Sequence, residues 1–275
     1  MPELPEVETI ARSLRERLLN LEFSRVEVHL QKCFPGNPGS SIDSLPRKKI
    51  LKIERRGKNI IFHLSGGIAM LVHLRMSGKL RIVPSRAPRE KHTHVIFSFR
   101  NHSHQLRYVD PRQFGRIWME RKGPKDHPQS LAHLGPEPLE ISAPEFIRRA
   151  QSKKKAIKSL LLDQRFLAGV GNIYADEVLF RIRVHPRRRA DSLGEKVLRQ
   201  MHRELQRILK EAIRAGGTSV RSYVDATGAI GGFQNLLGVY GKEGETCPVC
   251  GTSIQRERVG GRSSFFCPLC QPPAK

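Results

Sequence analysis

The chain has 275 residues and carries 49 lysines and arginines against 26 aspartates and glutamates, a formal net charge of +23. This surplus favours a nucleic-acid backbone as the partner, and no apolar run approaches the ~20 residues that a membrane span needs. The N-terminus has neither the cationic flank nor the apolar stretch of a signal peptide, so we expect a reducing cytoplasmic location.

The first half of the sequence predicts one helix followed by short strands. Apolar residues recur at helical spacing over residues 5–19, with Glu6 and Glu8 in the first turn. The predicted strands are short, evenly spaced and bounded by turn residues, which favours a two-layer β-sandwich over a parallel sheet. They are Arg25–Leu30, Ile50–Glu54, Asn59–Leu64, Ile68–Leu74, Leu80–Val83, His94–Phe99, Gln105–Val109 and Arg116–Met119.

The second half predicts helices, so the fold class is α+β. A proline-rich linker covers residues 123–143. The predicted helices are 144–150, 156–164, 172–180 and 193–215, and a glycine-rich loop covers 216–241. We therefore predict an N-terminal domain at 1–122, a helical domain at 144–241 and a small module at 242–275.

Four cysteines in that module have the spacing of a zinc site. Cys247 and Cys250 form one pair, Cys267 and Cys270 the other, and sixteen residues separate the pairs. Four thiolates would close the coordination shell and make one Zn²⁺ structural. The alternatives are two disulfides, which a reducing compartment disfavours, or four unconnected buried thiols. The fifth cysteine, Cys33, has no partner in this scheme.

The N-terminus could carry chemistry of its own. Once Met1 is removed, Pro2 presents a secondary amine that can attack an electrophilic sugar carbon and form an iminium. Glu3 lies beside it as a possible acid or base. The alternative is an ordinary helix start, in which Pro5 suits the first turn and the glutamates complement the helix dipole.

Several segments together resemble one protein family. The N-terminal residues 1–9 (MPELPEVET) are similar to the start of the formamidopyrimidine-DNA glycosylases, bacterial enzymes of base-excision repair. Further similar segments follow in the same order at residues 55–58, 73–78, 110–115, 160–164, 169–177 and 261–267. The resemblance implies an N-terminal β-sandwich, a helix-two-turn-helix domain and a C-terminal zinc hairpin.

The resemblance also implies an activity. The protein would be a bifunctional DNA glycosylase and AP lyase that excises oxidised purines, chiefly 8-oxoguanine and formamidopyrimidines, from duplex DNA. Pro2 would be the nucleophile at C1′, and Glu3 would move the proton that opens the sugar ring. Lys58 would assist β-elimination, and Arg262 would assist δ-elimination.

An extruded base leaves a void in the duplex that must be filled. The resemblance assigns Met76 and Phe114 to that void and turns Arg112 toward the orphaned cytosine. From the residues alone, ordinary core packing is the alternative for Met76 and Phe114.

The remaining predicted contacts hold the backbone and the lesion. Asn172 would present the next helix N-terminus to a phosphate or simply cap that helix. The other residues that the resemblance places near DNA are Lys153, Lys158, His73 and His92, although a lysine run is usually a solvated face. The glycine-rich loop would cap the extruded base, with lesion contacts from Glu6, Ser219, Arg221 and Tyr223.

Two other functions stay open on the sequence. One is an endonuclease VIII-like glycosylase for oxidised pyrimidines, which the Arg112-x-Phe114 pattern and the long glycine-rich loop disfavour. The other is a non-catalytic zinc-dependent DNA-binding protein, which would have no use for Pro2, Glu3 and Lys58 together. The family also implies a monomer.

Overall fold

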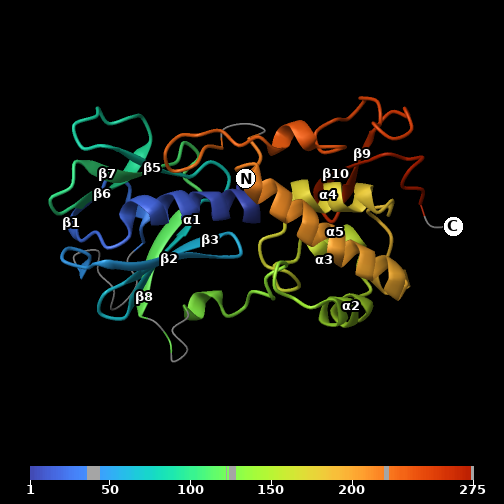
Figure 1. Ribbon diagram of the computed structural model, residues 1–275, viewed down its shortest axis with the longest axis horizontal. Coiled ribbons are helices and arrows are strands. Elements are labelled where there is room, and N and C mark those ends of the chain that lie inside the picture. The colour runs from blue at the N-terminus through green and yellow to red at the C-terminus, as the bar shows by residue number, and fades with distance from the viewer. Residues whose placement is uncertain (36–43, 122, 124–127, 220–222, 274–275) are drawn as a thin grey trace. The chain divides into compact units, whose positions relative to one another are not determined.

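The computed structural model describes residues 1–35, 44–121, 123, 128–219 and 223–273 (Figure 1). The chain forms two compact units. The first contains Met1–His133 and Ala215–Gly232, and the second contains Leu134–Arg214 and Phe233–Lys275.

The first unit begins with helix α1 (Leu4–Leu18), which is followed by strands and short 3-10 turns. The strands are β1 (Phe23–Val28), β2 (Ile50–Arg56), β3 (Asn59–Leu64), β4 (Ile68–His73), β5 (Lys79–Pro84), β6 (Thr93–Phe99), β7 (His104–Val109) and β8 (Arg116–Arg121). The 3-10 turns whose residues are all described include η1 (Gln31–Cys33) and η3 (Gln129–Leu131). All eight predicted strands are confirmed with ends shifted by no more than two residues.

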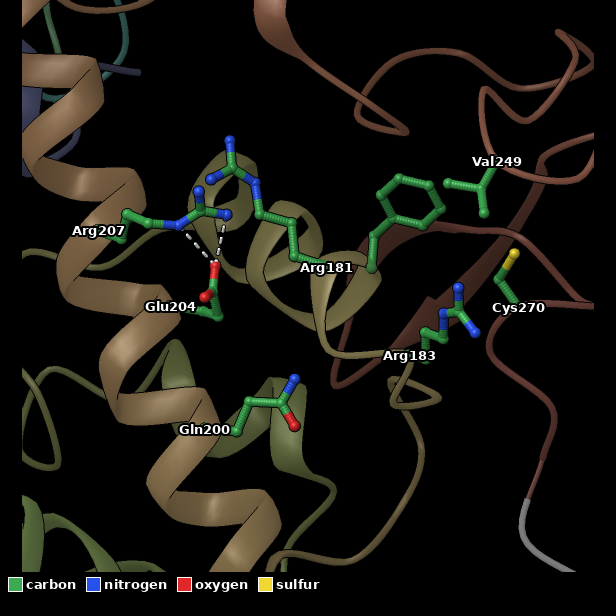
Figure 2. Close-up of a pocket in the computed structure, with 8 residues that line it drawn as sticks. Arg181, Arg183, Gln200, Glu204, Arg207, Val249 and Cys270 are labelled. Atoms are coloured by element: carbon green, nitrogen blue, oxygen red, sulfur yellow. Dashed lines mark hydrogen bonds and ion pairs between the residues drawn. The ribbon is translucent and has the colours of Figure 1, made fainter.

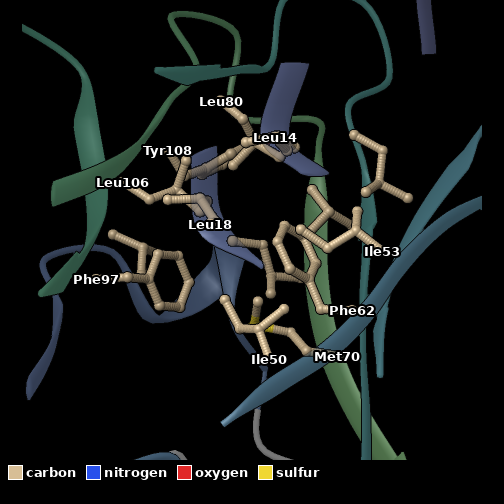
Figure 3. Packing of buried hydrophobic residues seen from close by; sticks show 14 of the residues in the cluster. Leu14, Leu18, Ile50, Ile53, Phe62, Met70, Leu80, Phe97, Leu106 and Tyr108 are labelled. Atoms are coloured by element: carbon tan, nitrogen blue, oxygen red, sulfur yellow. The ribbon is translucent and has the colours of Figure 1, made fainter. Parts of the chain in front are cut away.

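These strands form two antiparallel four-stranded sheets, ordered β1-β6-β7-β5 and β2-β3-β4-β8. One apolar cluster draws on both sheets and on α1, as Figure 3 shows with Phe62 of β3, Phe97 of β6 and Leu14 of α1. These three side chains are fully buried. The predicted sandwich is therefore confirmed, and the amphipathic helix contributes to the same core.

The second unit contains the helices and the C-terminal hairpin. Its elements are α2 (Ala143–Gln151), α3 (Ile157–Leu161), α4 (Asn172–Arg181), η4 (Ala190–Ser192), α5 (Glu195–Arg214), η5 (Phe233–Leu236), β9 (Gln255–Val259) and β10 (Arg262–Phe266). Helix α5 packs against α2 and α4 through one buried stripe. None of the described helices is both long and apolar enough to cross a bilayer.

Helix α3 ends three residues earlier than predicted. The carboxylate of Asp163 accepts a hydrogen bond from the Arg165 backbone N–H at 3.0 Å. Such a local bond from an aspartate stabilises a turn and competes with the helical pattern. The turn therefore ends the helix at Leu161 rather than Gln164.

Residues 215–232 belong to the first unit, whereas the sequence grouped them with the helical domain. Their hydrogen bonds explain this placement. The Thr218 N–H donates to Glu6 of α1 at 2.8 Å, and the Ala226 carbonyl accepts the Ile82 N–H of β5 at 2.8 Å. Contacts between residues so far apart along the chain leave no local signal in the sequence.

Candidate active site and nucleic-acid interface

The start of α1 places Pro2 and Glu3 in a buried setting. Glu3 is the N-cap residue, and its N–H donates to Glu6 Oε2 at 2.8 Å. The other carboxylate oxygen of Glu6 accepts the Thr218 N–H. Glu6, which is 1% exposed, therefore joins the first turn of α1 to the loop at residue 218.

Lys58 lies in the two-residue turn between β2 and β3. Gly57 occupies the first central position with φ 57°, as a type II′ hairpin turn requires. Arg55 donates to Glu8 of α1 at 3.1 Å and to the Gly57 carbonyl at 3.1 Å. The guanidinium group therefore ties the turn that carries Lys58 to the second turn of α1.

His73 ends β4 opposite Asn59, next to the same turn. Burial, followed by the cations Arg75 and Lys58, lowers the pKa of His73 to about 3. Its Nδ1 accepts the Arg75 backbone N–H at 3.0 Å, so the single ring proton of the neutral imidazole lies on Nε2. His73 is thus a neutral hydrogen-bond donor at this edge. His92, the other predicted phosphate donor, is half-buried just before β6.

Met76 and Phe114 are not core residues. They are 39% and 48% exposed, which removes the core-packing alternative that the sequence left open. Met76 follows β4 and Phe114 precedes β8. The Arg112 guanidinium carbon lies 4.9 Å from the centroid of the Phe114 ring, so a cation and an aromatic face are already stacked on one turn.

The residues predicted to cap the lesion also lie in the first unit. Ser219 Oγ accepts the Gly231 N–H at 2.9 Å and donates to the Tyr223 carbonyl at 3.0 Å. The Tyr223 hydroxyl donates to the Glu6 carbonyl at 3.3 Å. Three of the four predicted lesion residues are therefore connected, and Arg221 lies outside the described residues.

In the second unit, Asn172 is the first residue of α4, and Gly171 is its N-cap. The capping alternative for the Asn172 side chain is therefore wrong. Its Nδ2 donates instead to the Ser263 carbonyl of β10 at 2.9 Å. Asn172 thus joins the helix N-terminus to the zinc hairpin at Ser263, the residue after Arg262.

Lys158, expected near DNA, has no exposed surface. Its Nζ lies 2.6 Å from Asp176 Oδ1 and donates to the Ser263 carbonyl at 2.6 Å. Burial raises the pKa of Asp176 to about 7, although the Lys158 ammonium group opposes the shift. In this structure the lysine therefore contacts protein, and it fixes the same β10 carbonyl that Asn172 binds.

Arg262 follows the hairpin turn between β9 and β10 and is exposed. Gly260 and Gly261 both have positive φ, 56° and 77°, as a type I′ turn requires. A Cβ on Gly260 would lie 2.4 Å from Ser159 Oγ of α3. Glycine therefore suits both the turn and the close approach to α3 at this point, next to Arg262.

Sequence reasoning gave no role to two further polar groups. Glu177 accepts the backbone N–H groups of Gly238, Val239 and Tyr240 at 2.8–2.9 Å. Gln164 accepts the Gly169 N–H at 2.8 Å and so orders the loop before α4. The available signal was the pair Asp176–Glu177 within an otherwise apolar stretch of helix, where buried charges need partners.

The four predicted metal ligands converge. The sulfur atoms of Cys247, Cys250, Cys267 and Cys270 all lie within 4.8 Å of one another. The Cys250–Cys267 and Cys247–Cys270 sulfur distances are 3.4 and 3.9 Å. Tetrahedral coordination with Zn–S bonds of ~2.3 Å places sulfurs at about this separation, whereas a disulfide requires ~2.05 Å. The cluster therefore fits one structural zinc ion.

Two surface pockets of the second unit differ in charge. The pocket in Figure 2, beside Cys270, contains Arg181, Arg183 and Arg207. Arg207 pairs with Glu204 at 2.8 Å, as Figure 2 shows. Arg181 pairs with Glu211. Two of its three cations are therefore already neutralised.

The second pocket contains Lys153 with four other cations and a single carboxylate. The cations are Arg148, Arg149, Lys153, Lys155 and Arg165. The carboxylate, Asp163, pairs with Lys155. This pocket keeps a net positive charge and suits a phosphate group.

Comparisons with known proteins agree with this geometry. Residues 1–117 match the formamidopyrimidine-DNA glycosylase N-terminal domain, residues 134–224 the H2TH domain of the same enzymes, and residues 244–273 a zinc finger found in FPG and IleRS. The chain belongs to the formamidopyrimidine-DNA glycosylase family. A curated member from Pelotomaculum thermopropionicum is 44% identical over 274 residues, which are 98% of this chain and 99% of that protein. One from Ligilactobacillus salivarius is 44% identical over 273 residues, 98% and 99% of the two chains.

Solved structures are similar over nearly the whole chain. Lactococcus lactis Fpg in complex with DNA containing an abasic site has a TM-score of 0.89 and 37% identity, covering 98% of this chain and 100% of that one. A MutM complex with DNA containing carbocyclic 8-oxo-G has a TM-score of 0.89 and 37% identity, covering 99% and 100%. The MutM protein of Thermus thermophilus has a TM-score of 0.87 and 40% identity, covering both chains fully.

Proposed function

We propose that this protein is a bifunctional DNA glycosylase and AP lyase that removes oxidised purines, namely 8-oxoguanine and formamidopyrimidines, from duplex DNA. The observation that carries the proposal is a full-length family match combined with the burial of Pro2 and Glu3 at the start of α1. Arg55 ties the turn that carries Lys58 to Glu8, in the second turn of the same helix. The solved relatives bound to an abasic site and to carbocyclic 8-oxo-G support the substrate class.

The first chemical step uses the N-terminal amine. With Met1 removed, the Pro2 nitrogen attacks C1′, and the damaged base leaves with the electrons of the glycosidic bond. The nitrogen then loses its proton, and its lone pair forms the iminium as the C1′–O4′ bond breaks. Glu3 supplies the proton that O4′ takes up. An α-amine has a pKa of ~8, and a cation close to it, the role proposed for Lys58, favours its neutral, nucleophilic form.

Strand cleavage follows from the iminium. Removal of a C2′ proton expels the 3′-phosphate, and a second elimination expels the 5′-phosphate. Lys58 assists the first elimination. Arg262, exposed on its hairpin turn, assists the second by stabilising the departing phosphate.

Base extrusion uses the exposed residues of the first unit. Met76 and Phe114 fill the void, because each presents an apolar side chain to solvent rather than to the core. Arg112, stacked on Phe114, faces the orphaned cytosine. Glu6, Ser219 and Tyr223 form the surroundings of the extruded base.

The phosphates are held by several groups. In the first unit, neutral His73 and half-buried His92 donate hydrogen bonds. In the second, Asn172, the N-terminus of α4 and Lys153 contact the backbone. Lys158 contributes indirectly by fixing Ser263 beside Arg262. One structural zinc ion keeps the hairpin folded. The curated relatives are bacterial proteins, and we place this enzyme in a bacterial cytoplasm as a monomer.

Borohydride trapping tests the proposal. The mature protein, with Pro2 confirmed as the first residue, is incubated with an 8-oxoguanine·C duplex and sodium borohydride. We expect a covalent protein–DNA adduct that maps to Pro2. Pro2→Gly should cripple cleavage while DNA binding stays nearly intact.

The other outcomes separate the alternatives. Equal activity of Pro2→Gly would refute the nucleophile. An adduct with an oxidised-pyrimidine duplex but none with 8-oxoguanine would favour the endonuclease VIII-like enzyme. Binding without any adduct would leave a non-catalytic DNA-binding protein.

A further inference from the structure

Asp110 is a fully buried carboxylate immediately before the turn that carries Arg112 and Phe114. Its Oδ1 accepts the Ser77 hydroxyl at 2.5 Å and the Arg112 N–H at 3.3 Å. Its Oδ2 accepts the Tyr108 hydroxyl at 3.0 Å and the Gly115 N–H at 2.8 Å. One side chain thus binds the Met76–Ser77 turn and both ends of the Arg112–Phe114 turn.

The backbone of Asp110 is held as firmly as its side chain. Its N–H donates to the His92 carbonyl at 3.0 Å, and His94 Nε2 donates to its carbonyl at 2.9 Å. The Gln113 N–H also donates to that carbonyl, at 3.1 Å. Gln113 has φ 57°, so its backbone is in the left-handed conformation, which the hydrogen bond to Asp110 helps to maintain. The position of His92 is linked to the same aspartate.

The packing around this carboxylate leaves little room for adjustment. A Cβ on Gly115 would lie 1.8 Å from the Tyr108 hydroxyl oxygen. A Cβ on Gly78 would lie 2.5 Å from the Leu74 carbonyl and 2.9 Å from the same hydroxyl. The glycines that follow Ser77 and Phe114 therefore allow both turns to close around Tyr108 and Asp110.

The chemistry of the four donors requires an ionised carboxylate. Burial of Asp110 opposes ionisation, but the hydrogen bonds from Ser77, Gly115, Tyr108 and Arg112 outweigh it and lower the pKa of Asp110. Only an ionised carboxylate accepts on both oxygens without donating. Four hydrogen bonds within one buried group also make it costly to leave any donor without its acceptor.

We propose that Asp110 is the positioning residue for duplex invasion: it fixes the Met76 turn against the Arg112–Phe114 turn so that the three side chains enter the void as one unit. This inference rests on the void-filling roles given under the proposed function. It assigns Asp110 no contact with DNA or with the reacting sugar.

Loss of Asp110 should therefore affect duplex and single-stranded substrates differently. A void and an orphaned base exist only in a duplex, so loss of Asp110 impairs base extrusion and reading of the opposite base. A single-stranded oligonucleotide with an abasic site has neither, yet its cleavage still needs Pro2, Glu3 and Lys58. A merely structural role would impair both substrates in the same proportion.

Asp110→Asn is the informative variant because it keeps the shape of the side chain. The amide nitrogen of the asparagine cannot accept a hydrogen bond, so the donors on that side lose their acceptor. At least one of the two turns is then no longer held. We expect kcat for excision from an 8-oxoguanine·C duplex to fall by ~10-fold or more, because the void-filling side chains would be misplaced. The preference for cytosine over adenine opposite the lesion should shrink, while borohydride trapping on the single-stranded abasic oligonucleotide should change by less than ~2-fold.

Two further variants each remove a single hydrogen bond to Asp110. Tyr108→Phe removes one donor to Asp110 and keeps the buried ring, and Ser77→Ala removes only the tie to the Met76 turn. Both should show smaller losses than Asp110→Asn on the duplex and none on the single strand. Asp191→Asn, at a half-buried aspartate paired with Arg189, makes the same change in net charge and should match the wild type.

Each outcome has a defined meaning. Wild-type excision by Asp110→Asn would overturn the inference and leave the proposed function intact. Parallel losses on both substrates would reduce Asp110 to a general structural role and also overturn it. If Asp110→Asn fails to fold, Tyr108→Phe and Ser77→Ala decide by the same comparison. If the wild-type protein forms no adduct with either substrate, the proposed function fails, and this inference falls with it.

Discussion

The two units hold their DNA-facing turns by different means. In the first unit, turns project from strands anchored in one large apolar cluster that spans both sheets and α1. At the zinc end of the second unit, the apolar cluster contains only Phe180, Val239, Cys247, Ile254 and Cys267 among the buried residues that the structure describes. There, the buried ion pair Lys158–Asp176 and the four thiolates replace apolar area. The first unit should therefore tolerate loss of charge or metal, and the second should not.

Removal of zinc should expose this difference most strongly. Cys247→Ser breaks the coordination shell, and structural zinc contributes ~10 kcal/mol or more to folding of such small modules. We expect loss of bound zinc, unfolding of residues 244–273 and loss of tight DNA binding, while the sandwich keeps its circular dichroism and its own melting transition. Zinc content and calorimetry measure these outcomes.

Cys33→Ser provides the control because Cys33 is buried in the core of the first unit, whereas the four ligands belong to the second. It should lower the melting temperature of that unit and keep one equivalent of zinc. Unchanged zinc content in Cys247→Ser would refute the four-cysteine site.

The next largest effect concerns the buried pair Lys158–Asp176. Lys158→Met leaves Asp176 without its cation and should destabilise the second unit by ~3–5 kcal/mol. The double variant Lys158→Met/Asp176→Leu should recover most of that loss, because paired apolar residues avoid the desolvation cost. Denaturant unfolding measures both. Weaker DNA binding by Lys158→Met at unchanged stability would instead indicate a direct phosphate contact.

The cost of Lys158→Met should depend on pH. Burial already raises the pKa of Asp176 to about 7, and removal of the opposing cation raises it further. The folded variant then holds a proton that the unfolded chain, with an aspartate pKa of ~3.9, has released. Its stability therefore falls as pH rises, so the loss relative to wild type should be smaller at pH 5 than at pH 8. An equal loss at both pH values would contradict this assignment.

The sequence predicted the fold closely because its signals are local. Alternation and turn residues locate each strand, and the cysteine spacing locates the zinc module. The contacts that the sequence did not predict join residues that are far apart along the chain. Lys158 lies among other lysines and resembles a solvated residue, but its partner Asp176 is eighteen positions away and on another helix. The group at Asp110 joins residues as far apart as Ser77 and Gly115, so the sequence shows only an Asp-Pro turn.

Lys153 should give the smallest effect, and it tests whether the second unit also holds DNA by simple surface charge. Lys153 is exposed in a cationic pocket, so Lys153→Ala should leave folding unchanged and weaken DNA binding about equally for lesion and undamaged duplexes. Loss of one phosphate contact reduces the slope of log affinity against log salt by about 1.

Lys196→Ala removes an equal charge from an exposed site at the start of α5, outside that pocket, and should keep the wild-type slope. Equal slopes for the two variants would show that Lys153 contributes only to the overall field of the protein. A reduced slope for Lys153→Ala alone would establish a local contact that depends on neither the buried Lys158–Asp176 pair nor the metal. Charge at the surface of the second unit would then be separable from the charge that holds it together.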